Sequence, residues 1–344
     1  MTDSSYLSTI RERVVVFDGA SGTWLQGHDL GPDDFGGDAL EGCNEILCDT
    51  RPELITQMHR EYLEAGADAI ETNSFGAFGV PLREYDIADR AHELSLKAAQ
   101  LARAAADEFS TDERPRWVGG SMGPGTQFAT LGNISYEDLR ASYFQSALGL
   151  LEGGIDLYVI ETQFDLLGAK AAMTACRDAM AEVGRDVPIQ VQVTGRMLPG
   201  TEISAALVAL DAMGPDVIGI NCATGPVEMA EHVRHLAQTS RVPIVVMPNA
   251  GLPSVVDGKM HYDLTAEQFV EHQTRFVEEL GVSVVGGCCG TTPEYIRGLA
   301  EAVGGRKVDW KEGEFEHGAT SIYSLVPFEQ DASFMIIGER TNAN

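Results

Sequence analysis

Val14-Val15-Val16-Phe17 is an uninterrupted apolar run, and the polar turn Asp18-Gly19-Ala20-Ser21-Gly22-Thr23 follows it directly. A strand that is apolar on both faces is typical of a parallel sheet covered by helices on both sides. The same unit, a short β-branched run and then an amphipathic stretch, recurs along the chain, as expected for parallel strands joined by crossover helices. This opening stretch therefore predicts an α/β fold.

Eight such units follow one another along the chain. The predicted strands are Val14–Phe17, Ala69–Asn73, Trp117–Gly120, Leu157–Glu161, Ile189–Val193, Val217–Asn221, Ile244–Met247 and Ser283–Gly286. The predicted helices include Pro52–Glu64, Ile87–Phe109, Tyr136–Gly149, Leu167–Ala181, Pro226–Ala237, Ala266–Leu280 and Pro293–Val303. Thr265 and Thr292 precede two of these helices as N-cap residues. Eight units predict a single (β/α)8 TIM-type barrel, and periodicity alone leaves a doubly wound open sheet as the alternative.

Polar residues gather where the predicted strands end. Besides Asp18, they are Glu71-Thr72-Asn73-Ser74, Glu161-Thr162-Gln163, Asn221-Cys222, Asn249-Ala250-Gly251 and Cys288-Cys289. In barrels of this kind, the C-terminal ends of the strands and the loops that follow them carry the active site. The sequence therefore predicts a functional site at this end of the barrel.

The composition disfavours several classes of partner. A formal net charge of −28 argues against nucleic acid and anionic membrane surfaces, because phosphate binding rests on clustered Lys and Arg. No apolar run approaches the roughly 18 residues of a membrane span, and the polar start Met1-Thr2-Asp3-Ser4-Ser5 lacks the pattern of a signal peptide. Six cysteines in 344 residues do not make a disulfide scaffold. We therefore expect a cytoplasmic enzyme whose thiols serve metal binding or catalysis.

Three of the cysteines are predicted to form a zinc site. Cys222 closes one strand run, and Cys288 and Cys289 lie in the turn Gly286-Gly287-Cys288-Cys289-Gly290. Zinc prefers tetrahedral sulfur and nitrogen ligands, and catalytic zinc sites leave one position open. Adjacent strand residues point to opposite faces, so the pair can share an ion only where the strand has ended, and the glycines supply that backbone freedom. The alternative interpretation is three small buried hydrophobes.

The other candidate ligands are interpreted as structural. Cys43 and Cys48 have no evident third partner, and Cys176 falls in an alanine-rich helical stretch, so core packing is expected for all three. His232 and His235 lie three residues apart in the middle of one predicted helix. We expect both histidines on a solvated helix surface.

An open zinc position with three thiolate ligands favours a thiol as the substrate. A free thiol is mostly protonated at neutral pH, with a pKa near about 8.5, whereas a zinc-coordinated thiol is deprotonated. Such a site indicates thiol alkylation. Asp18 and Glu161 are predicted to pair with an α-ammonium, and the Gly19–Gly22 turn to receive an α-carboxylate on its backbone N–H groups. The alternatives are carboxylates that only cap helices and a turn that binds nothing, since it lacks GxGxxG and lysine.

Four motifs resemble those of the zinc-dependent homocysteine S-methyltransferases. They are Asp18-Gly19-Ala20-Ser21-Gly22-Thr23, Glu71-Thr72-Asn73-Ser74-Phe75, Ile220-Asn221-Cys222 and Gly286-Gly287-Cys288-Cys289-Gly290, and the resemblance runs over about residues 12–305. It implies a (β/α)8 barrel that binds Zn²⁺ through Cys222, Cys288 and Cys289. It also implies homocysteine as the fourth zinc ligand and its S-methylation to methionine as the activity.

The resemblance further implies how the amino acid is held. Asp18 and Glu161 would contact the amino group, and the Ala20–Ser21 turn, together with Gly19, would contact the carboxylate. Asn249 is expected to contribute a substrate contact from the loop after the seventh strand. Ser21 stands where the family pattern has methionine, which leaves its side-chain role open without affecting the backbone contact.

Two segments resemble the cobalamin-dependent methionine synthases within this family. Ile337-Gly338-Glu339-Arg340-Thr341-Asn342 is similar to the opening strand of their folate-binding domain, and Pro248-Asn249-Ala250-Gly251 resembles this branch more than the betaine-using one. The resemblance implies a homocysteine-binding barrel at 1–305, a linker at 306–332 and the start of a truncated folate-binding domain at 333–344. Methylcobalamin, held by a cobalamin-binding module absent from this chain, would be the methyl donor, and the cobalamin- and folate-binding modules would be the partners.

Two alternatives remain open at this point. A stand-alone homocysteine S-methyltransferase that uses betaine or S-methylmethionine would share the barrel and the zinc site. A non-catalytic scaffold stabilised by zinc would need a fourth protein ligand. The sequence offers no obvious fourth ligand beyond a distant histidine such as His261.

Overall fold

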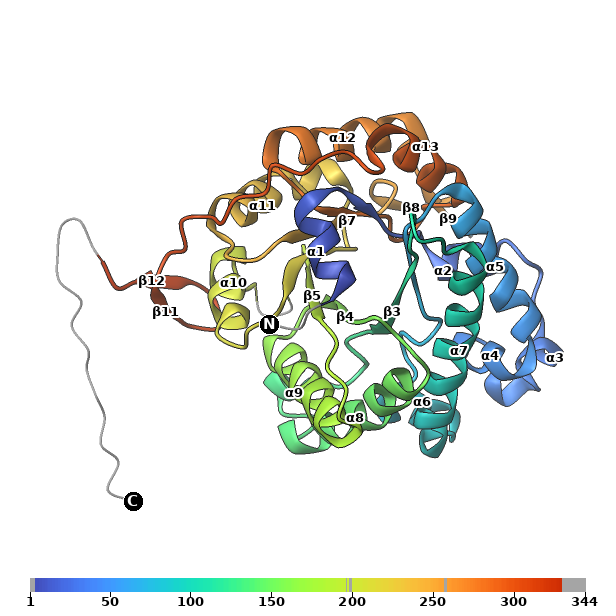
Figure 1. Cartoon of the computed structure of the whole chain (residues 1–344). Coiled ribbons are helices and arrows are strands. Elements are labelled where there is room, and N and C mark those ends of the chain that lie inside the picture. The colour runs from blue at the N-terminus through green and yellow to red at the C-terminus, as the bar shows by residue number, and fades with distance from the viewer. Residues whose placement is uncertain (1–3, 196, 198–199, 257–258, 330–344) are drawn as a thin grey trace, which may run out of the picture.

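Residues 4–195, 197, 200–256 and 259–329 are described by a computed structural model of the chain. Within them, eight parallel strands form a ring with helices around it (Figure 1). The strands are β1 (Val15–Val16), β2 (Ala69–Glu71), β3 (Trp117–Met122), β4 (Leu157–Gln163), β5 (Ile189–Thr194), β6 (Val217–Asn221), β7 (Ile244–Met247) and β10 (Val284–Val285).

The order of the strands decides between the two predicted architectures. The order in the sheet is β1-β10-β7-β6-β5-β4-β3-β2. Each barrel strand therefore pairs with the barrel strand that comes before or after it along the chain, and the last, β10, pairs with the first, β1. A parallel bridge between Phe17 and Ala69 joins the first strand to the second and completes the ring. The predicted (β/α)8 barrel is therefore confirmed, and the doubly wound open sheet is excluded.

Helices cover the outside of the ring. The long ones are α5 (Pro52–Ala65), α7 (Ala91–Phe109), α8 (Tyr136–Glu152), α9 (Leu166–Val183), α10 (Ile203–Asp211), α11 (Pro226–Thr239), α12 (Ala266–Leu280) and α13 (Pro293–Val303). Shorter ones are α1 (Ser5–Glu12), α2 (Ser21–Gln26), α3 (Pro32–Phe35), α4 (Leu47–Thr50) and α6 (Gly79–Leu82), with 3₁₀ turns at 38–40, 44–46, 83–85, 88–90 and 129–131. In the described part of the chain, none of these helices has the length and apolarity to cross a membrane.

The two predicted N-cap threonines differ in what they do. Thr265 Oγ1 accepts a hydrogen bond from Gln268 N, and Gln268 Oε1 accepts one from Thr265 N, which forms a capping box at the start of α12. Thr292 also stands at an N-cap, ahead of α13, but its side chain makes no capping hydrogen bond. The helix starts were therefore predicted correctly, although only Thr265 caps with its side chain.

Helix α1 closes the N-terminal end of the barrel and lies across the centre of the ring (Figure 1). Its Tyr6 hydroxyl donates to Gln190 Oε1 at 2.7 Å, and its Ser5 hydroxyl accepts from Trp117 Nε1 at 3.1 Å. Tyr6 packs with the apolar side chains that point into the barrel. Because this end is filled, a ligand reaches the barrel interior from the C-terminal end of the strands.

The two-residue period of a strand determines which polar side chains point into the barrel. Ala69 and Val159 belong to the interior apolar cluster, whereas Ile70 and Ile160 belong to the cluster between strands and helices. Two residues beyond the interior members, Glu71 and Glu161 therefore also point inward. The interior thus changes from apolar to acidic toward its open end.

Two small hairpins lie outside the ring. The first, β8 (Pro253–Val256) and β9 (Lys259–Tyr262), follows β7, and the second, β11 (Gly318–Thr320) and β12 (Leu325–Pro327), lies beside α10 (Figure 1). The second hairpin falls in the predicted linker, and Tyr323 O accepts a hydrogen bond from Glu202 N at 2.8 Å. The predicted folate-domain segment, 333–344, lies outside the described residues, so the domain boundaries stay a prediction.

His59 on α5 gives the fold a specific sensitivity to acid. The side chain is fully buried, neither ring nitrogen has a partner among the described residues, and burial lowers its pKa from 6.5 to about 4. The unfolded chain therefore binds a proton more readily, and stability is lost as the pH falls from about 6.5 toward 4. We expect this group alone to lower the free energy of unfolding by about 2 kcal/mol between pH 7.5 and pH 5.

Urea unfolding at both pH values, for the wild-type protein and for His59→Leu, measures that contribution. The variant should show a pH-dependent loss smaller by about 2 kcal/mol. An identical loss in both proteins would contradict the assignment.

Candidate metal and substrate site

The three predicted zinc ligands meet at the open end of the barrel. Cys222 follows β6, Cys288 and Cys289 follow β10, and their sulfur atoms all lie within 4.8 Å of one another. The Cys222 and Cys289 sulfurs are 3.8 Å apart, which is the spacing, about 3.8 Å, of two sulfurs on a tetrahedral zinc with bonds of about 2.3 Å. The geometry of this donor set fits zinc.

Backbone turns bring these thiols together. Cys222 and Ala223 have φ angles of 57° and 65°, in the left-handed region that residues with a Cβ rarely adopt. Such strain is typical of functional sites. In the second loop only Gly290 has a positive φ, of 82°.

The reason predicted for Gly286 and Gly287 was therefore wrong, because neither has a positive φ among the described backbone angles. Both are needed for space instead. A Cβ on Gly286 would lie 2.8 Å from Phe17 Cβ, and one on Gly287 would lie 2.3 Å from Thr291 Oγ1. The two glycines let the cysteine loop pack closely against its surroundings.

The three thiols influence one another's protonation. Hydrogen bonds with Cys222 and Cys288 lower the pKa of Cys289 to about 3. Hydrogen bonds with Cys222 and Cys289 raise the pKa of Cys288 well above its ordinary value. The protein alone thus stabilises one thiolate, held by neighbouring S–H donors. A bound divalent cation supplies the charge needed to hold all three as thiolates.

The remaining candidate ligands lie elsewhere. The His261 side chain is 59% exposed and pairs with Asp263, so the distant histidine considered above is not at the site. Cys43, Cys48 and Cys176 are buried in the apolar core, which confirms their structural interpretation. In the described part of the chain, no His, Cys, Asp or Glu side chain joins the three thiols as a fourth ligand.

A cavity of about 270 Å³ adjoins the thiols inside the barrel mouth. Its lining includes all three cysteines, the turn after β1 and three glutamates, Glu45, Glu71 and Glu161. The cavity is therefore lined by thiols on one part and by glutamates on another, which we call the acidic wall. No Lys, Arg or His side chain of the described residues lines the cavity to balance the glutamates.

Glu161 is held rigidly at the cavity. Its Oε1 accepts from the Ser121 hydroxyl at 2.5 Å, and its Oε2 accepts from Asn221 Nδ2 at 3.1 Å. Burial raises the pKa of Glu161 to about 7, the Ser121 hydrogen bond opposes that rise, and the charge of Cys289 adds to it. A cationic ligand would restore the ionised form.

Asn221 connects the acidic wall to the metal ligands. Its Nδ2 donates to Glu161 and lies 4.0 Å from the Cys288 sulfur, while its Oδ1 accepts from Thr162 N at 2.7 Å. That contact holds Thr162 at a φ of 55°. No role was predicted for Asn221 beside Cys222, and its inward position at the end of β6 is the signal that was missed.

Asp18 is hydrogen-bonded to a residue that lines the cavity but does not line it itself. It is 1% exposed, its Oδ2 accepts from Glu71 N at 2.9 Å, and its Oδ1 has no partner among the described residues. Burial raises its pKa well above the ordinary value, and the charge of Glu161 adds to that rise. The structure therefore brings Asp18 close to Glu161 and to a residue outside the predicted set, Glu71.

The turn predicted to bind the substrate carboxylate, Gly19–Gly22, lines the cavity. One of its backbone N–H groups already donates a hydrogen bond within the protein. Gly19 packs so closely that a Cβ would lie 2.8 Å from Thr291 Oγ1. Ala20 N donates to Thr291 O at 3.2 Å. The N–H groups of Ser21 and Gly22, in the first turn of α2, have no hydrogen-bond partner among the described residues. These two donors are available to a carboxylate.

Asn249 does not line the cavity, although a contact with the substrate was predicted for it. Its backbone N–H donates to Thr224 O at 3.1 Å, and its side chain is buried. The Asn249 Oδ1 atom has no partner within the described residues. A substrate contact from Asn249 stays a prediction.

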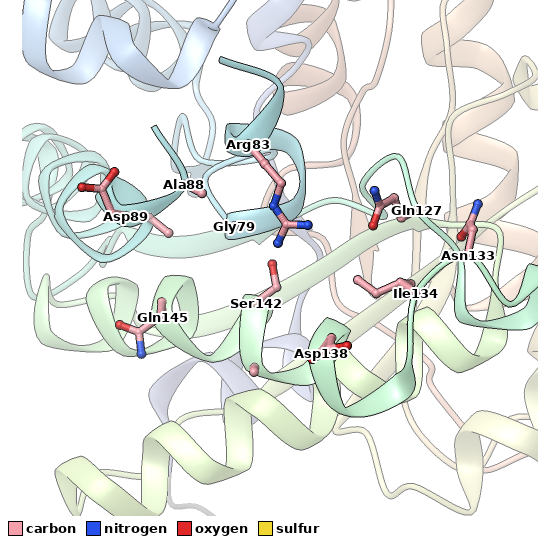
Figure 2. A pocket seen from close by; sticks show the side chains of 12 residues that line it. Gly79, Arg83, Ala88, Asp89, Gln127, Asn133, Ile134, Asp138, Ser142 and Gln145 are labelled. Atoms are coloured by element: carbon pink, nitrogen blue, oxygen red, sulfur yellow. The ribbon is translucent and has the colours of Figure 1, made fainter. Parts of the chain in front are cut away.

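A second hollow, of about 680 Å³, lies on the outer side of the barrel between α6 and α8 (Figure 2). Arg83, Ser142 and Gln145 are among the side chains that line it. It contains no cysteine or histidine and lies apart from the ends of the barrel strands, so it does not form part of the site.

Comparison with known proteins identifies the family. The sequence profile named Homocysteine S-methyltransferase matches residues 15–303, which is most of the chain and all eight barrel strands. The chain belongs to the homocysteine S-methyltransferase family. The resemblance inferred from the cysteine and glycine motifs is thereby confirmed.

Curated relatives are much longer than this chain. It is 50% identical to the methionine synthase of Mycobacterium tuberculosis and 48% identical to that of Mycobacterium leprae. Each match covers 99% of this chain and 29% of the relative. The chain therefore spans less than a third of the length of these methionine synthases.

Solved structures show the same fold. The homocysteine methyltransferase MmuM from Escherichia coli, in its metallated form, superimposes with a TM-score of 0.67 at 22% identity, over 85% of this chain and 96% of MmuM. Its apo form gives a TM-score of 0.63 at 23% identity, over 85% and 97% of the two chains. The chain thus shares its barrel fold with MmuM.

Proposed function

We propose that this chain binds Zn²⁺ through Cys222, Cys288 and Cys289 and binds homocysteine through its thiol at the open zinc position, for S-methylation to methionine. The observation that carries the proposal is a three-thiol cluster with zinc-like spacing on the wall of a cavity, which no further His, Cys, Asp or Glu side chain of the described residues joins. A closed structural site would have four protein ligands. This feature favours the catalytic interpretation over the scaffold.

Zinc held by thiolates supplies a position at which a substrate thiol is kept deprotonated at neutral pH. The protein's part is to orient the amino acid. Glu161 faces the α-ammonium, Asp18 adds its negative charge from its position beside Glu71, and the N–H groups of Ser21 and Gly22 receive the α-carboxylate. Asn221 fixes the Glu161 carboxylate relative to the cysteine loop.

The methyl donor is proposed to be methylcobalamin held by another module of a longer protein. The support is that the relatives at 48–50% identity are methionine synthases of which this chain spans 29%. In this account the cobalamin- and folate-binding modules are partners of the barrel, and the location is cytoplasmic. A stand-alone enzyme using betaine or S-methylmethionine is the competing proposal, and activity of this chain with either small donor would favour it.

Calorimetric binding tests the proposal directly. Zinc-loaded protein should bind L-homocysteine and should bind L-homoserine, which has a hydroxyl in place of the thiol, at least about 100-fold more weakly, because an alcohol is not deprotonated at neutral pH. Zinc-free protein should lose that preference. Equal affinity for the two compounds would contradict a thiol-binding metal.

Replacing Glu161 tests the acidic wall. The Glu161→Ala variant should bind L-homocysteine about 10- to 100-fold more weakly, because it removes a charge-assisted hydrogen bond of about 1.5–3 kcal/mol. Its zinc content should be unchanged, since Glu161 is not among the thiol ligands. Glu182→Ala, an exposed position near the end of α9, is the matched control. Unchanged affinity would remove Glu161 from the site.

A further inference from the structure

Tyr262 is a residue of the β8–β9 hairpin that contacts the loop carrying two of the three thiols. It is the last residue of β9, and it pairs with Pro253 across the hairpin. A Cβ on Gly290 would lie 2.5 Å from Tyr262 Cγ and 2.6 Å from its Cδ2, so the tyrosine ring packs directly on the Gly290 backbone. Gly290 follows Cys289 in the chain. The side chain of Tyr262 is therefore held next to the cysteine loop.

Backbone hydrogen bonds fix the hairpin relative to that loop. Ala250 N, ahead of the hairpin, donates to Cys289 O at 2.9 Å, and Leu264 N, after the hairpin, donates to Ala250 O at 3.1 Å. One residue, Ala250, thus links the cysteine loop to the chain on both sides of the hairpin. The position of Tyr262 beside Cys289 is therefore set by the backbone as well as by the packing of its ring.

The Tyr262 hydroxyl donates a hydrogen bond to the Cys289 sulfur. Burial and the charge of Cys289 raise the pKa of Tyr262, so the hydroxyl keeps the proton that it donates. Tyr262 does not line the cavity. Its hydroxyl thus reaches the sulfur from outside the cavity, and the metal position that faces the cavity stays free for a substrate.

A donor at this sulfur is useful because of the charge that the ligands carry. Three cysteine thiolates and a substrate thiolate together hold more negative charge than one divalent cation balances. A hydrogen bond to a ligand sulfur withdraws part of that charge, and such outer-shell contacts change metal affinity by about 10- to 100-fold. Asn221 Nδ2 lies 4.0 Å from the Cys288 sulfur as a comparable donor. Tyr262 supplies the corresponding donor to Cys289.

We propose that Tyr262 is a positioning residue for the metal, whose hydroxyl holds the Cys289 thiolate in place and reduces the charge that this sulfur donates to zinc. The contact between the Tyr262 ring and Gly290 sets the position from which the hydroxyl meets the sulfur. The inference rests on the proposed function, since it assumes that the three thiolates hold zinc. It gives the β8–β9 hairpin a role at the site, as the element that carries this donor.

Tyr262→Phe tests the hydroxyl alone, because it keeps the ring that packs on Gly290. Competition with a chromophoric zinc chelator should show a zinc affinity about 10- to 100-fold lower than that of the wild-type protein. In the cobalt(II)-loaded variant, the sulfur-to-cobalt charge-transfer bands should move to longer wavelength, because a sulfur without its hydrogen bond gives up an electron more readily. Tyr323→Phe is the matched control. Tyr323 is 59% exposed in the turn of the β11–β12 hairpin, and its variant should leave both readouts unchanged.

The outcomes separate this inference from the proposed function. If the wild-type protein does not retain zinc, the proposed function fails and the inference fails with it. If the wild-type protein retains zinc and Tyr262→Phe shows unshifted cobalt bands, with or without a loss of affinity, only the Tyr262 assignment is overturned. 4-Aminophenylalanine at position 262 keeps both the ring and a hydrogen-bond donor, so it distinguishes a lost donor from a poorly folded variant. It should restore the zinc affinity and the band position, and failure to restore them would overturn the assignment.

Discussion

The Cys222→Ala variant is expected to lose stoichiometric zinc. Two thiolates remain on the loop after β10, and the third sulfur, 3.8 Å from Cys289 in the structure, is removed. Loss of one ligand from a three-thiolate site should lower zinc affinity by at least about 100-fold, since second-shell changes alone cost 10- to 100-fold. Zinc per chain, measured by elemental analysis after gel filtration, should fall far below one.

Cys176→Ala is the matched control for that experiment. Cys176 is a fully buried thiol on α9 whose Sγ lies 3.6 Å from Met122 Sδ, in the core and away from the cavity lining. Its removal should cost some stability and leave zinc unchanged. Full zinc occupancy in Cys222→Ala would contradict the ligand assignment.

The Asp68→Asn variant is expected to be the most destabilised of the proteins considered. Asp68 lies at the seam where only the Phe17–Ala69 bridge joins β1 to β2 among the described residues. Its Oδ2 accepts from Val16 N at 3.2 Å and from Arg13, and its Oδ1 accepts from Arg114 and Arg116.

Removal of this charge leaves guanidinium groups without their anion. Arg116 is 7% exposed, and burial, followed by the charge of Arg114, lowers its pKa to about 10. Breaking a buried ion pair on one side costs about 3–5 kcal/mol. Urea unfolding should show a loss of that size for Asp68→Asn.

An exposed ion pair supplies the comparison. Asp309 pairs with Lys311 at 2.9 Å on the surface, with both side chains largely exposed. Asp309→Asn should change the free energy of unfolding by less than about 1 kcal/mol. A similar small loss in Asp68→Asn would show that the Asp68 cluster does not hold the barrel seam.

The barrel was predictable from the sequence because its strands are apolar on both faces. Runs such as Val14–Phe17 give a signal that does not depend on tertiary context. Helix α10 was missed because Ile203–Asp211 is apolar nearly all round, with five of its nine residues buried, and so shows no clear amphipathic period. Helix α1 was missed too. It fills the N-terminal end of the barrel, and no local sequence pattern predicts that position.

The metal ligands were predictable, whereas the full acidic wall was not. Cysteine is a common zinc ligand, so the three candidate ligands could be recognised by residue type alone. That they lie close together follows from the barrel topology, which places all strand ends on one side. Glu71 and Asn221 stood in the quoted motifs, but their roles depend on which residues of β2 and β6 face inward. That register is set by strand pairing across the whole sheet. Gly286 and Gly287 likewise required knowledge of what packs against them.

The central claim is that the metal keeps an open position for the substrate thiol. Cobalt(II) in place of zinc makes that position visible, because each sulfur bonded to cobalt adds charge-transfer absorption. Titration with L-homocysteine should increase these bands and saturate at one equivalent per chain. Cobalt that is bound by the thiols and shows a spectrum indifferent to homocysteine would contradict the claim and indicate a closed, structural site.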